Sequence, residues 1–199
     1  IAGEFVSRAA PDGYTLLVYG NTLWLLPLLR KEMPYDTFRD FAPVILATRN
    51  SNVLVVHPSL PVRNMAELVK FARARPGQLN YGSTAVSQIQ SGRLRPLAVA
   101  APEPSPIFPG VPTMAASGLP GVEVFSIFGV FVPARTPAAI IAQLNQEIGR
   151  ALQTPEVKAR LQSVGSEAAG GPPEALTAAM RAEFNRIENL SRSVSLRDE

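Results

Sequence analysis

The sequence predicts an α/β protein, because short strand-like runs alternate with amphipathic helical segments along its 199 residues. Three observations support this class. Runs of β-branched, aromatic and aliphatic residues, such as 14–19 and 52–57, are bounded by Pro or Gly. From Thr136 onward the apolar residues instead recur with the 3.6-residue period of a helix. The 19 Pro and 14 Gly residues provide the turns between these elements.

The first forty residues are expected to contain a helix end, a strand and a turn-rich stretch. Residues 1–10 have helix-like apolar spacing and are followed by a Pro-Asp-Gly turn. Residues 14–19 form a continuous apolar run of the kind found in buried parallel strands. The small polar loop 20–22 follows at the carboxyl end of that strand, and residues 33–43 are rich in turn signals.

The middle of the chain is expected to hold three strands and one well-capped helix. Residues 52–57 and 94–100 are strands of the buried type, and 79–81 begin a shorter one. Asn64 is the predicted N-cap of a helix, and Glu67, three residues later, completes a capping-box pattern.

A Pro-rich stretch and then three helices are expected in the rest of the chain. Residues 102–121 contain six Pro, so an extended surface segment with at most one short helix, at 113–117, is predicted. Residues 122–132 are strand-like. Thr136 is the predicted N-cap of a helix whose first residue is Pro137. The helices are expected at 136–152, 155–164 and 173–190.

Composition excludes several classes of function. The absence of Cys excludes a disulfide scaffold, a thiolate metal site and a cysteine nucleophile. The net charge of +3 comes from scattered Arg and Lys with acids between them, so no nucleic-acid partner is expected. No apolar run approaches the roughly 20 residues needed to span a bilayer. The chain starts at Ile1 without Met, so a signal peptide and a preceding segment are expected outside it.

A series of motifs resembles the extracytoplasmic solute receptors of tripartite tricarboxylate transporters, known as Bug receptors in Bordetella. The motifs occur in one order along nearly the whole chain. They are APDGYTLL at 10–17, PYD at 34–36, DFAPV at 40–44, NVLVVHPS at 52–59, PGQLNY at 76–81, GRLRPLAV at 92–99, VPT at 111–113, FG at 128–129 and PARTP at 133–137.

The resemblance implies a two-lobed periplasmic-binding-protein fold of type II-like topology, with missing segments. The first lobe would comprise 1–50 and 130–199, and the second 51–129, with hinges near 48–52 and 126–129. In the family several dozen further residues lie between the positions of Thr84 and Ala85, so a gap is expected there.

The resemblance also implies the function of a binding protein that closes on its ligand like a Venus flytrap. It would be a periplasmic monomer that captures a small carboxylate, such as a di- or tricarboxylate or an amino or aromatic acid, for the transporter's membrane permease. No cofactor, metal or catalytic residue is expected. Two alternatives stay open: a ligand-sensing domain for a signalling partner, and a serine-dependent enzyme using Ser83 with His57.

Two loops and two further residues are the predicted ligand contacts. Loops at strand ends and helix N-termini present backbone N–H groups that suit a carboxylate. The alternative for each loop is an ordinary polar turn. The predicted contacts are Gly20, Asn21 and Thr22 in the first loop, Gly82, Ser83 and Thr84 in the second, and Ser126 and Phe128 where the lobes would meet.

Other polar and aromatic residues have less specific roles. His57 has no nearby partner in the sequence that would orient it for catalysis, so a structural role is predicted. Trp24 and Tyr19 flank the first loop and are candidates either for stacking on ligand or for the core. The three cations considered for pairing with a carboxylate are Arg30, Arg93 and Arg135, although the sequence places none of them in a site.

Overall fold

A computed structural model describes residues 1–30, 32–80, 82, 88–89 and 91–193. The chain divides into two compact units. Unit 1 contains Ile1–Arg49, Ile127–Leu161 and Ser166–Glu199, and unit 2 contains Asn50–Ser126 and Gln162–Gly165. The lobes expected from the resemblance, 1–50 with 130–199 and 51–129, concern the complete receptor and stay a prediction.

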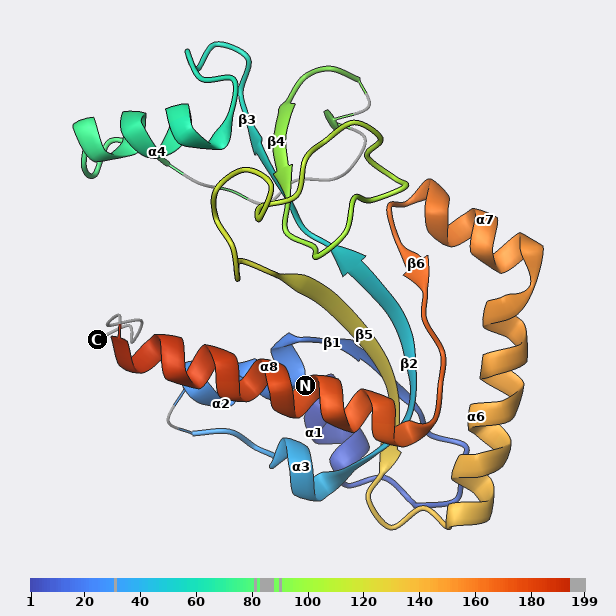
Figure 1. Ribbon diagram of the computed structural model, residues 1–199. Coiled ribbons are helices and arrows are strands. Elements are labelled where there is room, and N and C mark those ends of the chain that lie inside the picture. Colours follow the sequence, from blue (N-terminus) through green and yellow to red (C-terminus); the bar gives the residue numbers. More distant parts are fainter. Residues whose placement is uncertain (31, 81, 83–87, 90, 194–199) are drawn as a thin grey trace. The chain divides into compact units, whose positions relative to one another are not determined.

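Unit 1 is built on a four-stranded sheet in the order β1-β5-β2-β6 (Figure 1). Its strands are β1 (Leu17–Gly20), β2 (Phe41–Ser51), β5 (Phe125–Pro133) and β6 (Glu167–Ala168). The last residues of β2 and the first two of β5 belong to unit 2. The prediction of a buried parallel strand at 14–19 is wrong: β1 is shorter and runs antiparallel to β5. Because β1 is an edge strand, alternate side chains reach the surface, and Val18 is 64% exposed.

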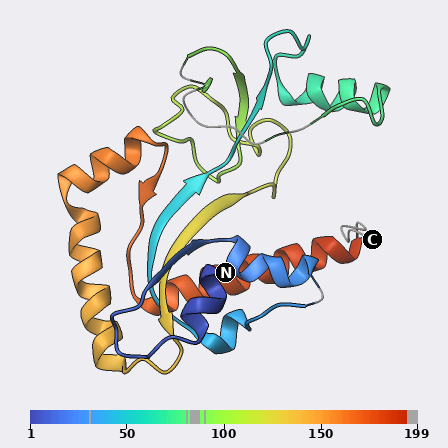
Figure 2. The ribbon, with the colours of Figure 1, turned by 180° about the vertical axis from the view of Figure 1, so that it is seen from behind.

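Five helices and most of a sixth, α7, belong to unit 1 in the described part of the chain. They are α1 (Ala2–Ser7), α2 (Thr22–Leu29), α3 (Thr37–Asp40), α6 (Ala138–Gln153), α7 (Pro155–Ser163) and α8 (Pro173–Ser193). In Figure 1 α8 crosses in front of the strands, and Figure 2, seen from behind, brings α1 and α2 to the front. The strand-helix alternation predicted from the sequence is therefore present in this unit.

The apolar stripe of α6 packs against the sheet as its period predicts. Ile141, Leu144 and Ile148 contact a buried cluster that includes Val44 and Val132. The predicted N-cap is wrong by one residue. Pro137 occupies the N-cap position, whereas the buried Thr136 donates its hydroxyl to the Pro133 carbonyl at 2.8 Å.

An aromatic cluster forms the other part of the unit 1 core. The rings of Trp24 and Phe41 pack against Phe131, at 6.4 and 6.5 Å between ring centroids. Leu176 and Met180 of α8 are fully buried. Burial of such large side chains stabilises the fold by roughly 1.5–3 kcal/mol each. This core holds α2 and α8 within unit 1.

Helix α2 was not predicted from the sequence, and it carries a proline at its sixth position. Pro27 has no N–H to donate to the carbonyl of Leu23, four residues earlier. The buried hydroxyl of Thr37 donates to that carbonyl instead, at 2.6 Å. The Leu23 carbonyl, which the proline leaves without a helical donor, is thus bonded by a side chain from α3.

The turn-rich stretch at 33–43 contains a short capped helix and then the start of a long strand. Asp36 is the N-cap of this helix and accepts hydrogen bonds from the backbone N–H groups of Phe38 and Arg39. Asp40 accepts two hydrogen bonds from the Arg39 guanidinium, at 2.7 and 3.0 Å. These bonds hold the pKa of Asp40 below its ordinary value.

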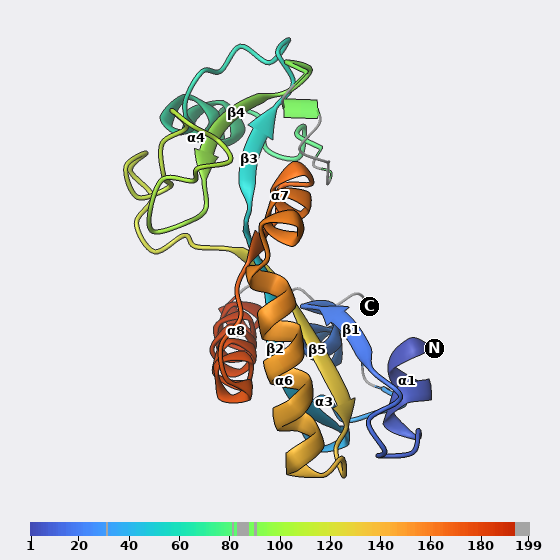
Figure 3. The same ribbon diagram turned by 90° about the vertical axis from the view of Figure 1, so that its right-hand side faces the viewer.

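Unit 2 contains the antiparallel pair β3 (Val53–Val56) and β4 (Arg95–Val99) beside helix α4 (Met65–Ala74), as Figure 3 shows. The predicted cap of α4 is confirmed, since Asn64 accepts the N–H of Glu67 at 2.9 Å. Glu67 in turn accepts the N–H of Arg63 at 2.7 Å. The strand predicted at 79–81 is not seen at residues 79 and 80, and residue 81 lies outside the described residues.

The Pro-rich stretch 102–121 contains no helix, in agreement with the prediction of at most a short one, but it consists largely of turns and is not confined to the surface as predicted. Phe108 and Met114 are only 7% and 6% exposed and belong to the apolar clusters of unit 2. Main-chain hydrogen bonds of 2.8 Å tie Val99 to Pro112 and to Met114. Prolines prevent a regular strand here, yet the segment still contributes to the core. No helix in the described part of the chain has the length and apolarity of a membrane span.

Candidate functional site

The first predicted loop lies where β1 ends and α2 begins. Gly20 is the last residue of β1, Asn21 is the N-cap of α2, and Thr22 is its exposed first residue. A Cβ on Gly20 would lie 3.2 Å from Cε1 of Phe128 and 3.4 Å from the carbonyl oxygen of Ile127. Glycine therefore allows the Phe128 ring to lie over the loop, and the structure brings four of the predicted contacts together in unit 1.

The first turn of α2 presents backbone donors. The N–H groups of Trp24 and Leu25 bond to the carbonyl of Asn21, at 3.2 and 3.0 Å. The N–H groups of Thr22 and Leu23 find no acceptor among the described residues. Unpaired donors at a helix N-terminus, together with the helix dipole, favour an anionic group. The loop can therefore bind a carboxylate without a cationic side chain.

The side chain of Asn21 connects this loop to two other elements of unit 1. Its Oδ1 accepts the backbone N–H of Ile127 in β5, at 2.6 Å. Its Nδ2 donates to Oε1 of Glu183 in α8. The second carboxylate oxygen of Glu183 accepts the indole N–H of Trp24, at 2.9 Å. Three elements that are far apart in the sequence are thus joined at the N-terminus of α2.

Phe128 provides an apolar surface beside the loop. Its side chain is 42% exposed, whereas Ile127 and Gly129 on either side of it are buried. Because side chains alternate along a strand, Phe128 shares a face of the sheet with Val130 and Val132, beyond the part that α6 covers. An exposed aromatic ring next to open backbone donors is able to contact the hydrocarbon part of an organic acid.

The remaining predicted contacts belong to unit 2 or lie outside the described residues. Ser126 donates its hydroxyl to Oδ1 of Asn52, at 3.0 Å. Gly82 is exposed, and a Cβ there would meet no described atom within 4 Å. Ser83 and Thr84 are not among the described residues. Their assignment as ligand contacts stays a prediction.

Sequence reasoning missed Glu183 and left Trp24 undecided. Trp24 is fully buried and donates to Glu183, so it belongs to the core and is not a stacking surface. Glu183 is the only acid on the inner stripe of α8, three residues after Met180 and four before Ile187. That position was the one signal in the sequence, because an acid on a buried stripe needs hydrogen-bond partners.

The other polar candidates do not gather at the loop. His57 is exposed, and its Nδ1 lies 2.7 Å from the Ser59 hydroxyl, within a turn. Arg30, Arg93 and Arg135 are all exposed, and the hydrogen bonds and ion pairs of the described residues link none of them to Asn21 or Thr22. Within the described ranges no three His, Asp or Glu side chains are grouped as a metal site would require.

Comparison with known proteins identifies relatives over nearly the whole chain. A family model described as "Tripartite tricarboxylate transporter family receptor" matches residues 1–88 and 84–196. A protein of Pseudomonas sp. strain P51, described as "UPF0065 protein in tcbD-tcbE intergenic region", is 31% identical over 96% of this chain and 72% of its own length.

Solved structures of similar proteins share the fold. A Rhodopseudomonas palustris protein, Rpa4515, whose structure is described as containing adipate, is 28% identical, with a TM-score of 0.86 over 96% of this chain and 81% of its own. MatC from the same species, described with bound malate, is 25% identical, with a TM-score of 0.78 over 94% of this chain and 82% of its own. The fold predicted from the resemblance, that of periplasmic solute-binding proteins, is confirmed.

The alignments also contain an internal difference in length. The two ranges of the family match overlap at residues 84–88. The alignment to the Pseudomonas protein runs over 241 positions while covering 96% of 199 residues, so about fifty positions have no counterpart in this chain.

Proposed function

Because the chain belongs to the receptor family of tripartite tricarboxylate transporters, we propose that it is a periplasmic receptor that captures a small carboxylate for a membrane permease. The observation that carries this proposal is the family match over residues 1–88 and 84–196. The structural similarity to Rpa4515 and MatC over more than nine-tenths of the chain supports it. The receptor acts as a monomer and releases its ligand chemically unchanged.

The ligand is a small organic acid, with dicarboxylates as the first candidates. The two structural relatives described above are named with adipate and malate, both of which have two carboxylates joined by a short carbon chain. In this chain the N–H groups of Thr22 and Leu23 would receive one carboxylate, and Phe128 would contact the carbon chain. Tricarboxylates and amino or aromatic acids remain in the proposed range.

The proposed binding residues are those predicted from the sequence, and each unit is considered by itself. Unit 1 contributes Gly20, Asn21, Thr22 and Phe128, whose proximity supports a common role. Unit 2 contributes Ser126 and the small polar loop of Gly82, Ser83 and Thr84. We also propose that a further segment of the complete receptor belongs between Thr84 and Ala85, in agreement with the overlap of the two matched ranges. An intact mass several kilodaltons above that of the printed sequence would support this segment.

Isothermal titration calorimetry tests the proposed function directly. Adipate, malate, citrate, glutamate and benzoate would be titrated separately into the protein, with adipamide as a neutral control that lacks carboxylates. The expected result is saturable binding of at least one acid and none of adipamide. Recovery of the bound acid unchanged after long incubation is also expected, because a receptor needs no turnover. Heat from none of the acids, with a folded protein, would contradict the proposal.

A further inference from the structure

The carboxylate of Glu183 accepts hydrogen bonds from two residues at the N-terminus of α2. Its two oxygens accept the Asn21 side-chain N–H and the indole N–H of Trp24, the latter at 2.9 Å. Hydrogen bonds to an ionised acceptor are roughly twice as strong as neutral ones. One side chain of α8 therefore holds both the N-cap and the third residue of α2.

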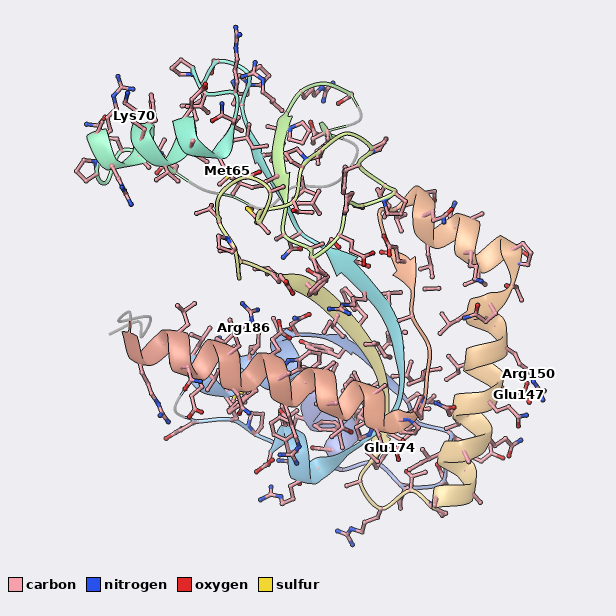
Figure 4. All side chains as sticks on the ribbon, in the orientation of Figure 1. Met65, Lys70, Glu147, Arg150, Glu174 and Arg186 are labelled. Carbon is pink, nitrogen blue, oxygen red and sulfur yellow. The ribbon has the colours of Figure 1, made fainter. Side chains whose placement is uncertain are left out.

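Among the described residues, no cationic side chain of α8 forms an ion pair with the Glu183 carboxylate. Arg186, one turn further along α8, is exposed and projects from the helix in Figure 4. A spacing of three residues permits an ion pair with Glu183, yet the ion pairs seen among the described residues join other partners, such as Arg192 with Glu188. In the described part of the chain Glu183 is thus hydrogen-bonded by Asn21 and Trp24.

The bonds of Asn21 also determine which groups of the loop remain for a ligand. Its Oδ1 accepts the Ile127 N–H while its Nδ2 donates to Glu183, so the amide bridges β5 and α8. The backbone donors of Thr22 and Leu23 stay open next to it. Their direction depends on the first turn of α2, which Asn21 and Trp24 anchor.

We infer that Glu183 is a positioning residue for ligand binding, because it holds Asn21 and Trp24 and thereby orients the open N–H groups of Thr22 and Leu23. This inference rests on the proposed carboxylate-binding function. Glu183 does not touch the ligand. Its contribution is preorganisation: donors already held in place cost less ordering free energy when the ligand arrives.

The test uses variants that keep the shape of the side chains. In Glu183→Gln one carboxylate oxygen becomes an NH2 group. This group would face the N–H of Asn21 or of Trp24, so one of the two hydrogen bonds is lost. In Asn21→Asp two carboxylates face each other. In the double variant the polarity is exchanged: the new amide at position 183 donates to the new carboxylate at position 21 and still accepts from Trp24. Calorimetry with adipate and malate, and thermal melts by circular dichroism, are measured for all four proteins.

The expected result is that Glu183→Gln weakens acid binding about tenfold, which corresponds to 1.4 kcal/mol. The double variant should bind more tightly than the sum of the two single losses predicts, because the exchanged pair restores the bond. The effect of a negative charge at position 21 on an anionic ligand cancels in this cycle. Glu188→Gln is the matched control: it removes an exposed pair with Arg192 on the same helix and should change affinity less than twofold.

A role of Glu183 in stability alone would give non-additive melting temperatures but additive binding losses, and that result would overturn the inference. Unchanged affinity in folded Glu183→Gln would overturn it as well. If Glu183→Gln does not fold, Glu183→Asp, which keeps the charge but shortens the side chain, must show the affinity loss. A wild-type protein that binds none of the acids would instead overturn the proposed function, and the inference with it.

Discussion

Leu176 of α8 lies directly against Gly129 of β5. A Cβ on Gly129 would be 2.5 Å from Cδ2 and 2.9 Å from Cδ1 of Leu176, a side chain that is fully buried. The absence of a side chain at position 129 lets α8 approach the sheet closely. Gly129 pairs with Tyr19 of β1, next to the candidate loop.

Gly129→Ala should destabilise the protein by about 1–3 kcal/mol, because the added methyl overpacks a core that has no free volume at this point. Urea unfolding followed by the fluorescence of Trp24, the sole Trp and a buried one, measures the change. Adding Leu176→Ala removes the obstructing methyls, so the double variant should lose less than the two single losses together. Additive losses would contradict the proposed overlap.

Gly149→Ala is the opposite case and should stabilise the protein. Gly149 lies inside α6, and its Cβ would meet only Cδ1 of Ile45, at an ordinary 3.6 Å. Alanine in a helix interior is favoured over glycine by about 0.5–1 kcal/mol. The midpoint of urea unfolding should therefore rise, and a fall would show that α6 has less space at this turn than the structure indicates.

Thr37→Val should cost about 1–3 kcal/mol, because it removes the donor to the Leu23 carbonyl while keeping nearly the same shape. That carbonyl has no partner within α2, since Pro27 lacks an N–H. Thr37→Ser keeps the hydroxyl and should retain most of the stability. Equal losses in both variants, measured by urea unfolding, would mean that the methyl and not the hydrogen bond matters.

Asp40→Asn should lower the melting temperature more at pH 7 than at pH 3. The hydrogen bonds from Arg39 lower the pKa of Asp40 in the folded protein. A carboxyl with a lowered folded pKa contributes stability above its unfolded value of about 3.9, and this contribution is lost as pH falls through the folded pKa. Melts by circular dichroism at both pH values check this, and an equal deficit at pH 3 would contradict it.

Phe128→Ala should weaken the binding of adipate about tenfold, since the exposed ring would lose contact with the carbon chain of the ligand. Malate, which has a shorter chain and a hydroxyl, should lose less. Because the ring is 42% exposed, only a small change in stability is expected. The ratio of the two dissociation constants, measured by calorimetry, is the informative quantity, and an unchanged ratio would remove Phe128 from the proposed contacts.

Elements governed by local signals were predicted well from the sequence. The cap of α4 by Asn64 and the helices near 136–152 and 173–190 follow from residues a few positions apart. The ordered motifs were also sufficient to predict the family and its fold. Local hydrogen bonds and helical periodicity need no knowledge of the rest of the chain.

Features that depend on distant partners were missed. Helix α2 was not predicted, and the carbonyl that its Pro27 leaves without a helical donor is bonded by Thr37 from another element. The antiparallel partner of β1 lies more than a hundred residues away, at positions such as Phe131. An apolar run alone does not specify the direction of its neighbour.

The candidate site divides in the same way. The sequence by itself determined the family and the small polar loop at 20–22, because these depend on residue types and their order. Only the tertiary structure decided that Asn21 bridges Ile127 and Glu183, that Trp24 is buried and that Phe128 lies over Gly20. Asn21 and Glu183 are 162 residues apart, and a hydrogen bond over that separation exists only after β1, β5 and α8 have packed on one core.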